Sequence, residues 1–266
     1  MITVAASYRE IAADLRQKIA EGQYRPGDKL PMLTELQELY GAGYQTVRSA
    51  IALLEQEGLV IAVRRRGTIV RERPERLRVT RSREVFRDEI GYYFDPTAQP
   101  WKALRTPAVR WGVVPIDLAA LMGMEPGSEV LVRDRVMGDP ETDAPKQLAT
   151  SYLPADLARG TRLADTDTGP GGIYDRLEEM GHRPLEWSES VSARMPSPEE
   201  AEALRLPTDV GVPLLRVLRI TTSPNGQVVE VNDTRMSSEL FEIGYTINRH
   251  PSARIPREVG YAEDDH

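Results

Sequence analysis

The segment 22–70 constrains this chain more than any other, because it places two short helical patterns on either side of a tight turn. The turn Pro26-Gly27 precedes a helix that we predict over residues 32–40. The break Gly41-Ala42-Gly43 separates it from a second helix, predicted over 44–57. Two helices joined this tightly must cross at a steep angle, and this geometry is typical of a helix-turn-helix.

A basic hairpin follows the two helices. Residues 59–63 are all apolar and residues 68–70 read Thr-Ile-Val, and these two short runs predict two strands. Arg64, Arg65, Arg66 and Gly67 join them. A helix in the DNA major groove with a cationic wing beside it would use these elements in this order. With a further helix that begins at the capping box Ser7-Tyr8-Arg9-Glu10, we predict a winged helix-turn-helix domain.

Three side chains at the start of the second helix have the chemistry to read DNA. Arg48 can donate two hydrogen bonds to guanine or bind a phosphate, and Gln45 can pair with adenine. Tyr44 can contact a sugar or a phosphate. The alternatives are a solvated arginine and packing roles for Gln45 and Tyr44. The charged hairpin could likewise be a solvated surface. Three adjacent cations are nevertheless suited to contact the phosphates of the DNA backbone or to enter a narrow minor groove.

The distribution of charge supports this interpretation although the net charge of the chain is −7. Residues 1–80 carry 13 basic and 10 acidic side chains, whereas the remainder carries 21 basic and 31 acidic ones. Charges farther apart than about 8–10 Å are screened at physiological salt. A basic N-terminal domain can therefore bind DNA while the rest of the chain is acidic.

The second half of the chain mixes strand patterns with short helices and lacks regular βαβ spacing. Strands are predicted at 130–137, 213–222 and 227–235, and helices at 116–122, 173–180 and 198–206. This mixture favours an α+β domain with a mainly antiparallel sheet. We expect the DNA-binding domain at 1–72, a polar linker at 73–84, the second domain at 85–249 and a polar tail at 250–266.

The chain resembles the GntR family of transcription regulators, in its HutC branch. The N-terminal resemblance rests on Pro26-Gly27-Asp28-Lys29-Leu30-Pro31, Thr46-Val47-Arg48 and Arg66-Gly67-Thr68. The second domain resembles the UTRA effector domain, through Leu131-Val132-Arg133-Asp134-Arg135 and Thr150-Ser151-Tyr152-Leu153-Pro154. The resemblance implies a chorismate-lyase-like fold for this domain and a DNA-contacting position at Thr34. The expected DNA-binding residues are Thr34, Tyr44, Gln45, Thr46, Arg48, Arg64, Arg65, Arg66 and Gly67.

Arg133 and Arg135 lie two residues apart on a predicted strand and therefore share a face. Two arginines on an inward face need anions, which either acidic residues across the sheet or a ligand can supply. The resemblance implies a ligand carboxylate or phosphate. The expected effector-binding residues are Arg133, Arg135, Ser151, Tyr174, Glu230 and Arg235.

These features predict a transcription regulator, a repressor that binds a two-half-site DNA operator as a homodimer and is released by a small anionic effector. The alternatives are an enzyme in which a chorismate-lyase-like domain carries a DNA-binding module, and a constitutive DNA-binding protein without effector. No nucleophile–base pair, cofactor motif or metal triad is visible, so we expect no catalytic residue, cofactor or metal. No segment approaches the length and apolarity of a membrane span, and the chain has no cysteine, so we expect a soluble cytoplasmic protein.

Overall fold

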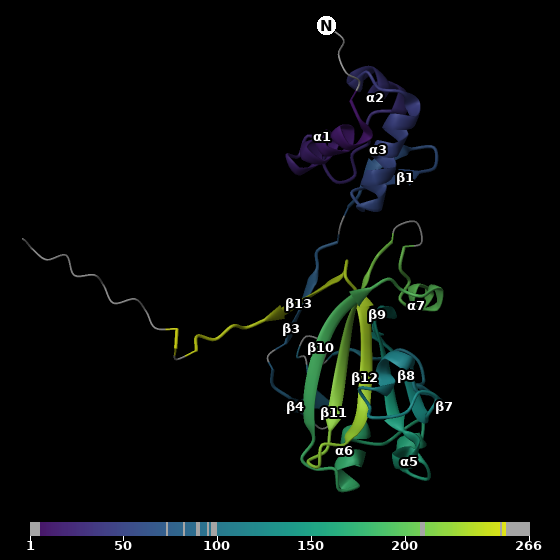
Figure 1. Ribbon diagram of the computed structural model, residues 1–266, viewed down its shortest axis with the longest axis vertical. Helices are drawn as coiled ribbons and strands as arrows, with labels where there is room; N and C mark the ends of the chain where they lie inside the picture. The colour runs from purple at the N-terminus through teal and green to yellow at the C-terminus, as the bar shows by residue number, and fades with distance from the viewer. Residues whose placement is uncertain are drawn as a thin grey trace, which may run out of the picture.

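The computed structural model describes residues 6–72, 74–81, 83–88, 91–94, 96, 100–207, 211–250 and 252–253. An N-terminal domain of helices with a small hairpin stands at one end of a larger domain built on a curved sheet (Figure 1). In chain order the elements are α1 (Tyr8–Ala20), α2 (Leu33–Tyr40), α3 (Tyr44–Gln56), β1 (Val60–Val63), β2 (Gly67–Val70), β3 (Leu77–Arg81), β4 (Phe86–Arg87), β5 (Tyr92–Tyr93), β6 (Lys102–Ala103), β7 (Ala108–Val113), α4 (Ile116–Ala119), β8 (Glu129–Asp139), β9 (Ala144–Pro154), α5 (Ala155–Ala158), the 3₁₀ helix η1 (Arg162–Ala164), α6 (Gly172–Glu179), β10 (Glu186–Arg194), α7 (Pro198–Ala203), β11 (Leu214–Thr222), β12 (Val228–Ser237) and β13 (Phe241–Tyr245).

The N-terminal domain confirms the predicted winged helix-turn-helix. Ser7 and Glu10 form the expected reciprocal cap of α1, in which the Ser7 Oγ accepts from the Glu10 amide at 3.3 Å. One core joins the three helices to the hairpin, and its fully buried members include Leu15, Leu36 and Leu54. Arg16 of α1 donates two hydrogen bonds to Glu57 after α3, at 2.6 and 2.9 Å. The domain therefore combines one hydrophobic core with an ion pair between its first and third helices.

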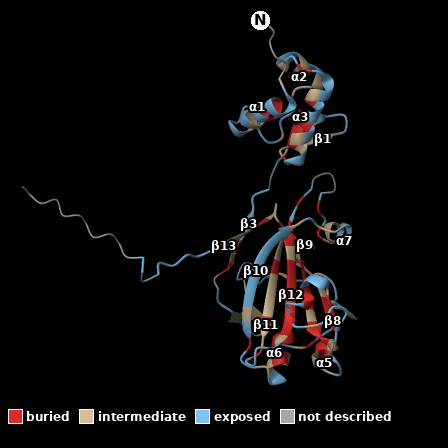
Figure 2. Ribbon diagram, in the orientation of Figure 1, coloured by how far each residue is buried: buried red, intermediate tan, exposed pale blue. Residues whose placement is uncertain are grey.

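The C-terminal domain is built on an antiparallel sheet in the order β10-β11-β12-β9-β8-β6, and β7 also pairs with β8. The central strand β12 is buried along most of its length (Figure 2). Strands β8, β11 and β12 correspond to the three strands expected from sequence, and helices surround the sheet, which confirms the predicted α+β fold. Strands β9 and β10 were not predicted. Most side chains of β10 are exposed, so its sequence lacks the apolar alternation by which a strand is recognised.

The two faces of this sheet are covered by different helices. On the α6 face, Ile173, Tyr174 and Leu177 pack against Leu131 and Leu153. On the α4 face, which is the opposite one, Leu118 and Met122 pack against Val130, Val132 and Val231. Neighbouring residues of a strand point to opposite faces, so each charged residue of the sheet can be assigned to one face from its register.

The expected linker at 73–84 contains a strand. Residues Leu77–Arg81 form β3, which pairs in parallel with β13, and Val79 is fully buried against Val217 and Phe241. The arginine-rich sequence hides this strand, because only Val79 among its side chains is apolar and buried. Of the expected polar tail at 250–266, residues 251 and 254–266 lie outside the described part of the chain.

Candidate functional site

The start of α3 presents an exposed polar surface. Tyr44 is 47% exposed, and Gln45 and Arg48 are exposed on the same helix, whereas Val47, Ala50 and Ile51 are buried in the core. The N-cap residue is Gly43, which has no side chain to satisfy the first amides of the helix. Such amides can bind a phosphate oxygen. Thr46 is half-buried, and Thr34 is exposed near the start of α2.

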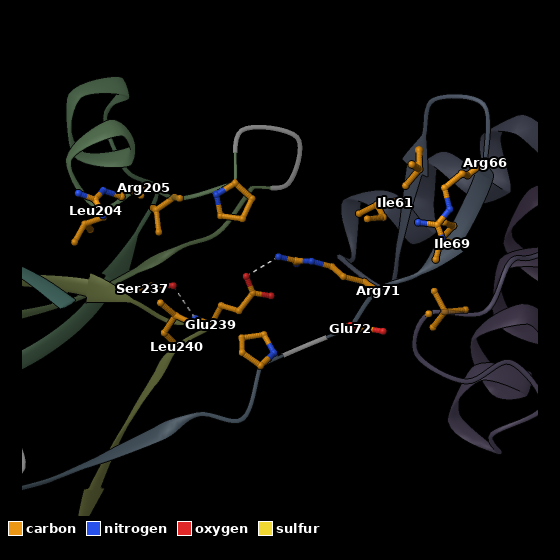
Figure 3. Close-up of a pocket in the computed structure, with 16 residues that line it drawn as sticks. Ile61, Arg66, Ile69, Arg71, Glu72, Leu204, Arg205, Ser237, Glu239 and Leu240 are labelled. Carbon is orange, nitrogen blue, oxygen red and sulfur yellow. Dashed lines mark hydrogen bonds and ion pairs between the residues drawn. The ribbon is translucent and has the colours of Figure 1, made fainter. Parts of the chain in front are cut away.

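The wing is a tight hairpin between β1 and β2, and all three of its arginines are exposed. Arg65 adopts a left-handed conformation with φ 65° and Gly67 one with φ 93°. A Cβ at Gly67 would lie 2.9 Å from the Lys29 Cε, so Lys29 brings a fourth cation to the wing. Sequence reasoning had not assigned Lys29 a role. Arg66 differs from Arg64 and Arg65, because it lines a cleft toward the C-terminal domain (Figure 3).

A row of five polar residues crosses the α6 face of the sheet. The strand registers place them directly opposite one another, from β8 to β10. We call this set the polar row: Arg133, Ser151, Asn232, Arg219 and Glu189. Arg135 and Glu230 lie on the same face in adjacent rows, and Arg81 of β3 approaches the end of the row, 3.4 Å from the Glu189 carboxylate.

Arg133 is occupied by backbone carbonyls. Its side chain is buried, and it donates to the oxygens of Leu163, Asp165 and Thr166 at 2.7, 2.5 and 3.1 Å. Burial, and after it the charge of Arg135, lowers the pKa of Arg133. Arg133 therefore fastens η1 and the loop after it to the sheet.

Arg135 and Ser151 meet beside Asn232. The Ser151 Oγ accepts from Arg135 at 3.1 Å and from the Asn232 amide at 3.0 Å. The Arg135 Nε is buried and has no hydrogen-bond partner among the described residues. A buried guanidinium N–H without an acceptor is costly, so this group is a candidate ligand contact.

Tyr174 and Glu230 also meet on this face. The Tyr174 hydroxyl donates to the Glu230 Oε2 at 2.9 Å, and Thr221 donates to the same oxygen at 2.8 Å. The other oxygen, Oε1, is buried without a partner in the described part of the chain. Burial, and after it the charge of Glu230, raises the pKa of Tyr174, so the hydroxyl keeps its proton. Glu230 can therefore accept one more hydrogen bond, from a hydroxyl or an amine.

Aromatic side chains close this end of the site. Tyr92, Phe94 and Trp187 pack around Tyr174 with ring centroids 5.7–6.0 Å from its own. The Arg219 guanidinium lies 3.3 Å from the Phe94 ring centroid and is bound to Glu189 at 2.8 Å. Sequence reasoning missed Asn232 and Arg219. The alternation of strands would have found Asn232, because it lies two residues from Glu230.

Arg235 is not brought to this site. It lies five residues from Glu230 on β12 and so faces the α4 side of the sheet. There it contacts Glu200 at 3.2 Å and donates to Thr150 at 2.5 Å. Burial would raise the pKa of Glu200, but hydrogen bonds from Arg194 and the Ser197 amide, with the charge of Arg235, lower it to about 2. The sequence prediction grouped two residues that the sheet separates.

Family models match both domains. The model described as bacterial regulatory proteins of the gntR family matches residues 7–70, and the UTRA domain model matches residues 108–242, more than half of the chain. The chain belongs to the GntR family and carries a UTRA domain. GntR regulators bind DNA and UTRA domains bind small-molecule effectors, so this is a DNA-binding transcriptional regulator of the GntR/UTRA type.

Several relatives of this GntR/UTRA regulator match along most of their length. An uncharacterized HTH-type transcriptional regulator of Streptomyces coelicolor is 32% identical over 241 residues, covering 86% of this chain and 88% of that protein. The HTH-type transcriptional repressor NagR of Bacillus subtilis is 25% identical over 228 residues, covering 84% and 87%. A crystal structure described as a GntR-family transcriptional regulator has a TM-score of 0.72 at 25% identity and covers 92% and 98%.

Two further findings concern the part of this GntR/UTRA regulator that the structure describes. None of its helices is long and apolar enough to cross a membrane. No group of three or more histidine, aspartate or glutamate side chains is placed to hold a metal ion within the described residues.

Proposed function

We propose that this regulator is a repressor that binds a two-half-site operator as a homodimer and releases it when a small anionic molecule binds at the polar row. The observation that carries the proposal is the charge of the α6 face. Arg81, Arg133, Arg135 and Arg219 gather there with two carboxylates, Glu189 and Glu230. A largely buried surplus of cations is stabilised when an anion binds.

The proposed contacts differ between the two arginines of β8. Arg133 already donates to three carbonyls, so Arg135 is the arginine that contacts the anion, through its unpaired Nε. The Ser151 hydroxyl accepts from the Arg135 Nη2 and from the Asn232 amide, so both polar side chains lie beside this guanidinium. At the other end, the free Glu230 oxygen accepts from a hydroxyl or amine of the same molecule. The proposed effector therefore has an anionic group and a separate hydrogen-bond donor.

The proposed operator follows from the size of the recognition surface. The exposed side of α3 presents a few polar side chains at its first turns, among them Tyr44, Gln45 and Arg48, which is enough for a few base pairs. Two copies of the helix in adjacent major grooves supply the specificity that one copy lacks. The repressor assignment draws on the name of NagR, a relative along most of the chain.

The experiment begins by selecting duplexes from a random pool with the full-length protein. We expect a pseudopalindromic sequence and a complex of two protomers per duplex, measured by analytical ultracentrifugation. A panel of phosphorylated and carboxylated metabolites is then titrated against the complex, with uncharged analogues as controls. A single protomer on a non-repeated site would contradict the dimer proposal, and release by the uncharged analogues alone would contradict the anionic effector.

A further inference from the structure

An ion pair between the two domains stands between two clefts in the described part of the chain. Arg71, directly after the wing strand β2, donates to Glu239, two residues after the sheet strand β12, at 2.5 Å (Figure 3). Each cleft has a volume of about 610 Å³, and both residues line both clefts. The side chains are nevertheless only 12% and 14% exposed.

Such a pair determines orientation more than a surface ion pair does. An exposed pair contributes little, because water and salt screen it. When one partner of a largely buried pair is removed, the other charge remains desolvated without compensation. Both clefts border the pair, which therefore bridges the two domains among the described residues.

Each partner of the pair is joined through one strand to the polar row. Glu239 is fixed to the end of β12 by its amide, which donates to the Ser237 Oγ at 3.2 Å, and β12 carries Asn232 and Glu230. Arg71 is followed by β3, whose last residue is Arg81, which contacts Glu189. A shift of either strand at the polar row would therefore move one partner of the pair relative to the other.

We propose that Arg71 and Glu239 are the positioning pair that sets the orientation of the DNA-binding domain on the effector domain. The part of this inference that concerns the effector rests on the proposed function above. The pair holds the docked arrangement, and movement of β12 or β3 at the polar row loosens it. Because orientation sets the spacing between two recognition helices, the pair selects which half-site spacing is bound.

A distance measurement tests the positioning role without operator or effector. The chain contains no cysteine, so spin labels can be placed at Ala13→Cys on α1 and Ser190→Cys on β10, both exposed. The labelled protein is diluted with unlabelled protein, so that distances within one protomer dominate the electron–electron resonance signal. Tryptophan emission on heating checks that the effector domain of each variant is folded, because the three tryptophans lie in that domain.

We expect a narrow distance distribution for the parent protein and a broader, shifted one for Arg71→Ala and Glu239→Ala. The docked population should fall by about tenfold or more, since a charge-assisted hydrogen bond is worth at least one factor of ten. The exchanged pair R71E/E239R should restore the narrow distribution. The control is Arg78→Ala, which removes another 2.5 Å arginine–glutamate pair, between β3 and Glu242 of β13.

Unchanged distributions in both single variants would overturn the inference, and so would failure of the exchanged pair to restore order. A second measurement then uses the selected operator with its half-site spacing changed by one or two base pairs. The single variants should discriminate between these spacings less than the parent protein does. Undiminished discrimination would refute spacing control, whereas failure to select any operator would instead count against the proposed function.

Discussion

Replacing Arg133 with alanine should destabilise the effector domain by about 2–4 kcal/mol, and this value follows from the acceptors that lose their donor. This residue is 5% exposed and donates to three carbonyls, one in η1 and two in the loop after it. Leu163 is fully buried, so its oxygen would keep most of the desolvation penalty, about 1–3 kcal/mol. Asp165 and Thr166 are exposed, so water can replace the donor there at smaller cost.

Urea unfolding followed by tryptophan emission measures this change in the right domain. Trp101, Trp111 and Trp187 all lie in the effector domain, so the signal excludes the DNA-binding domain. The matched control is Arg135→Ala, because Arg135 donates only to Ser151 among the described residues and leaves that hydroxyl its second contact. The control should lose about 1 kcal/mol or less. A loss of less than 1 kcal/mol in Arg133→Ala would refute the view that Arg133 fastens the loop.

Three further predictions concern the DNA-binding surface and the α4 face. Arg48→Ala should weaken binding to the selected operator by about 1–3 kcal/mol and binding to a scrambled duplex less, measured by fluorescence anisotropy; equal losses would make Arg48 a phosphate contact. Neutralising Arg64 and Arg65 together should reduce the salt dependence of binding, by roughly 0.9 in slope per phosphate contact, whereas Arg66→Ala should leave it nearly unchanged. A slope change of about 0.9 in Arg66→Ala would place Arg66 on DNA. Glu200→Gln should cost about 3 kcal/mol of unfolding free energy near pH 7, because a pKa lowered to about 2 stabilises the fold above the unfolded value of 4.5. The difference from the parent protein should shrink as the pH falls from 4.5 toward 2, and a constant difference over this range would contradict the assignment.

The N-terminal domain was predictable because its signals are local. A capping box, four-residue apolar spacing and glycines at the turns each depend on neighbours within a few residues, and together they fixed α1, α2, α3 and the wing. Strand β3 was missed for the opposite reason. Its partner β13 lies far away in the chain, and of its two apolar residues Leu77 is exposed and only Val79 is buried.

The effector site was predictable only in part. The two-residue spacing of Arg133 and Arg135 correctly placed both on one face, but nothing local shows that carbonyls of a distant loop occupy Arg133. The five-residue spacing of Glu230 and Arg235 already implies opposite faces, so that grouping could have been avoided from sequence. The meeting of Arg219 with Asn232 depends on strand register, which no single segment reveals.

Release of operator DNA from Arg135→Ala, compared with Arg235→Ala, tests the central claim most directly. Both changes remove an arginine from the same sheet, but Arg135 lies on the α6 face and Arg235 on the α4 face. The measurement is the concentration of an anionic metabolite that releases half of a fluorescent operator. We predict that this half-release concentration rises about tenfold or more for Arg135→Ala, because a charge-assisted hydrogen bond to the metabolite is lost. It should change little for Arg235→Ala. An unchanged concentration for Arg135→Ala would contradict the proposal that the polar row binds the effector.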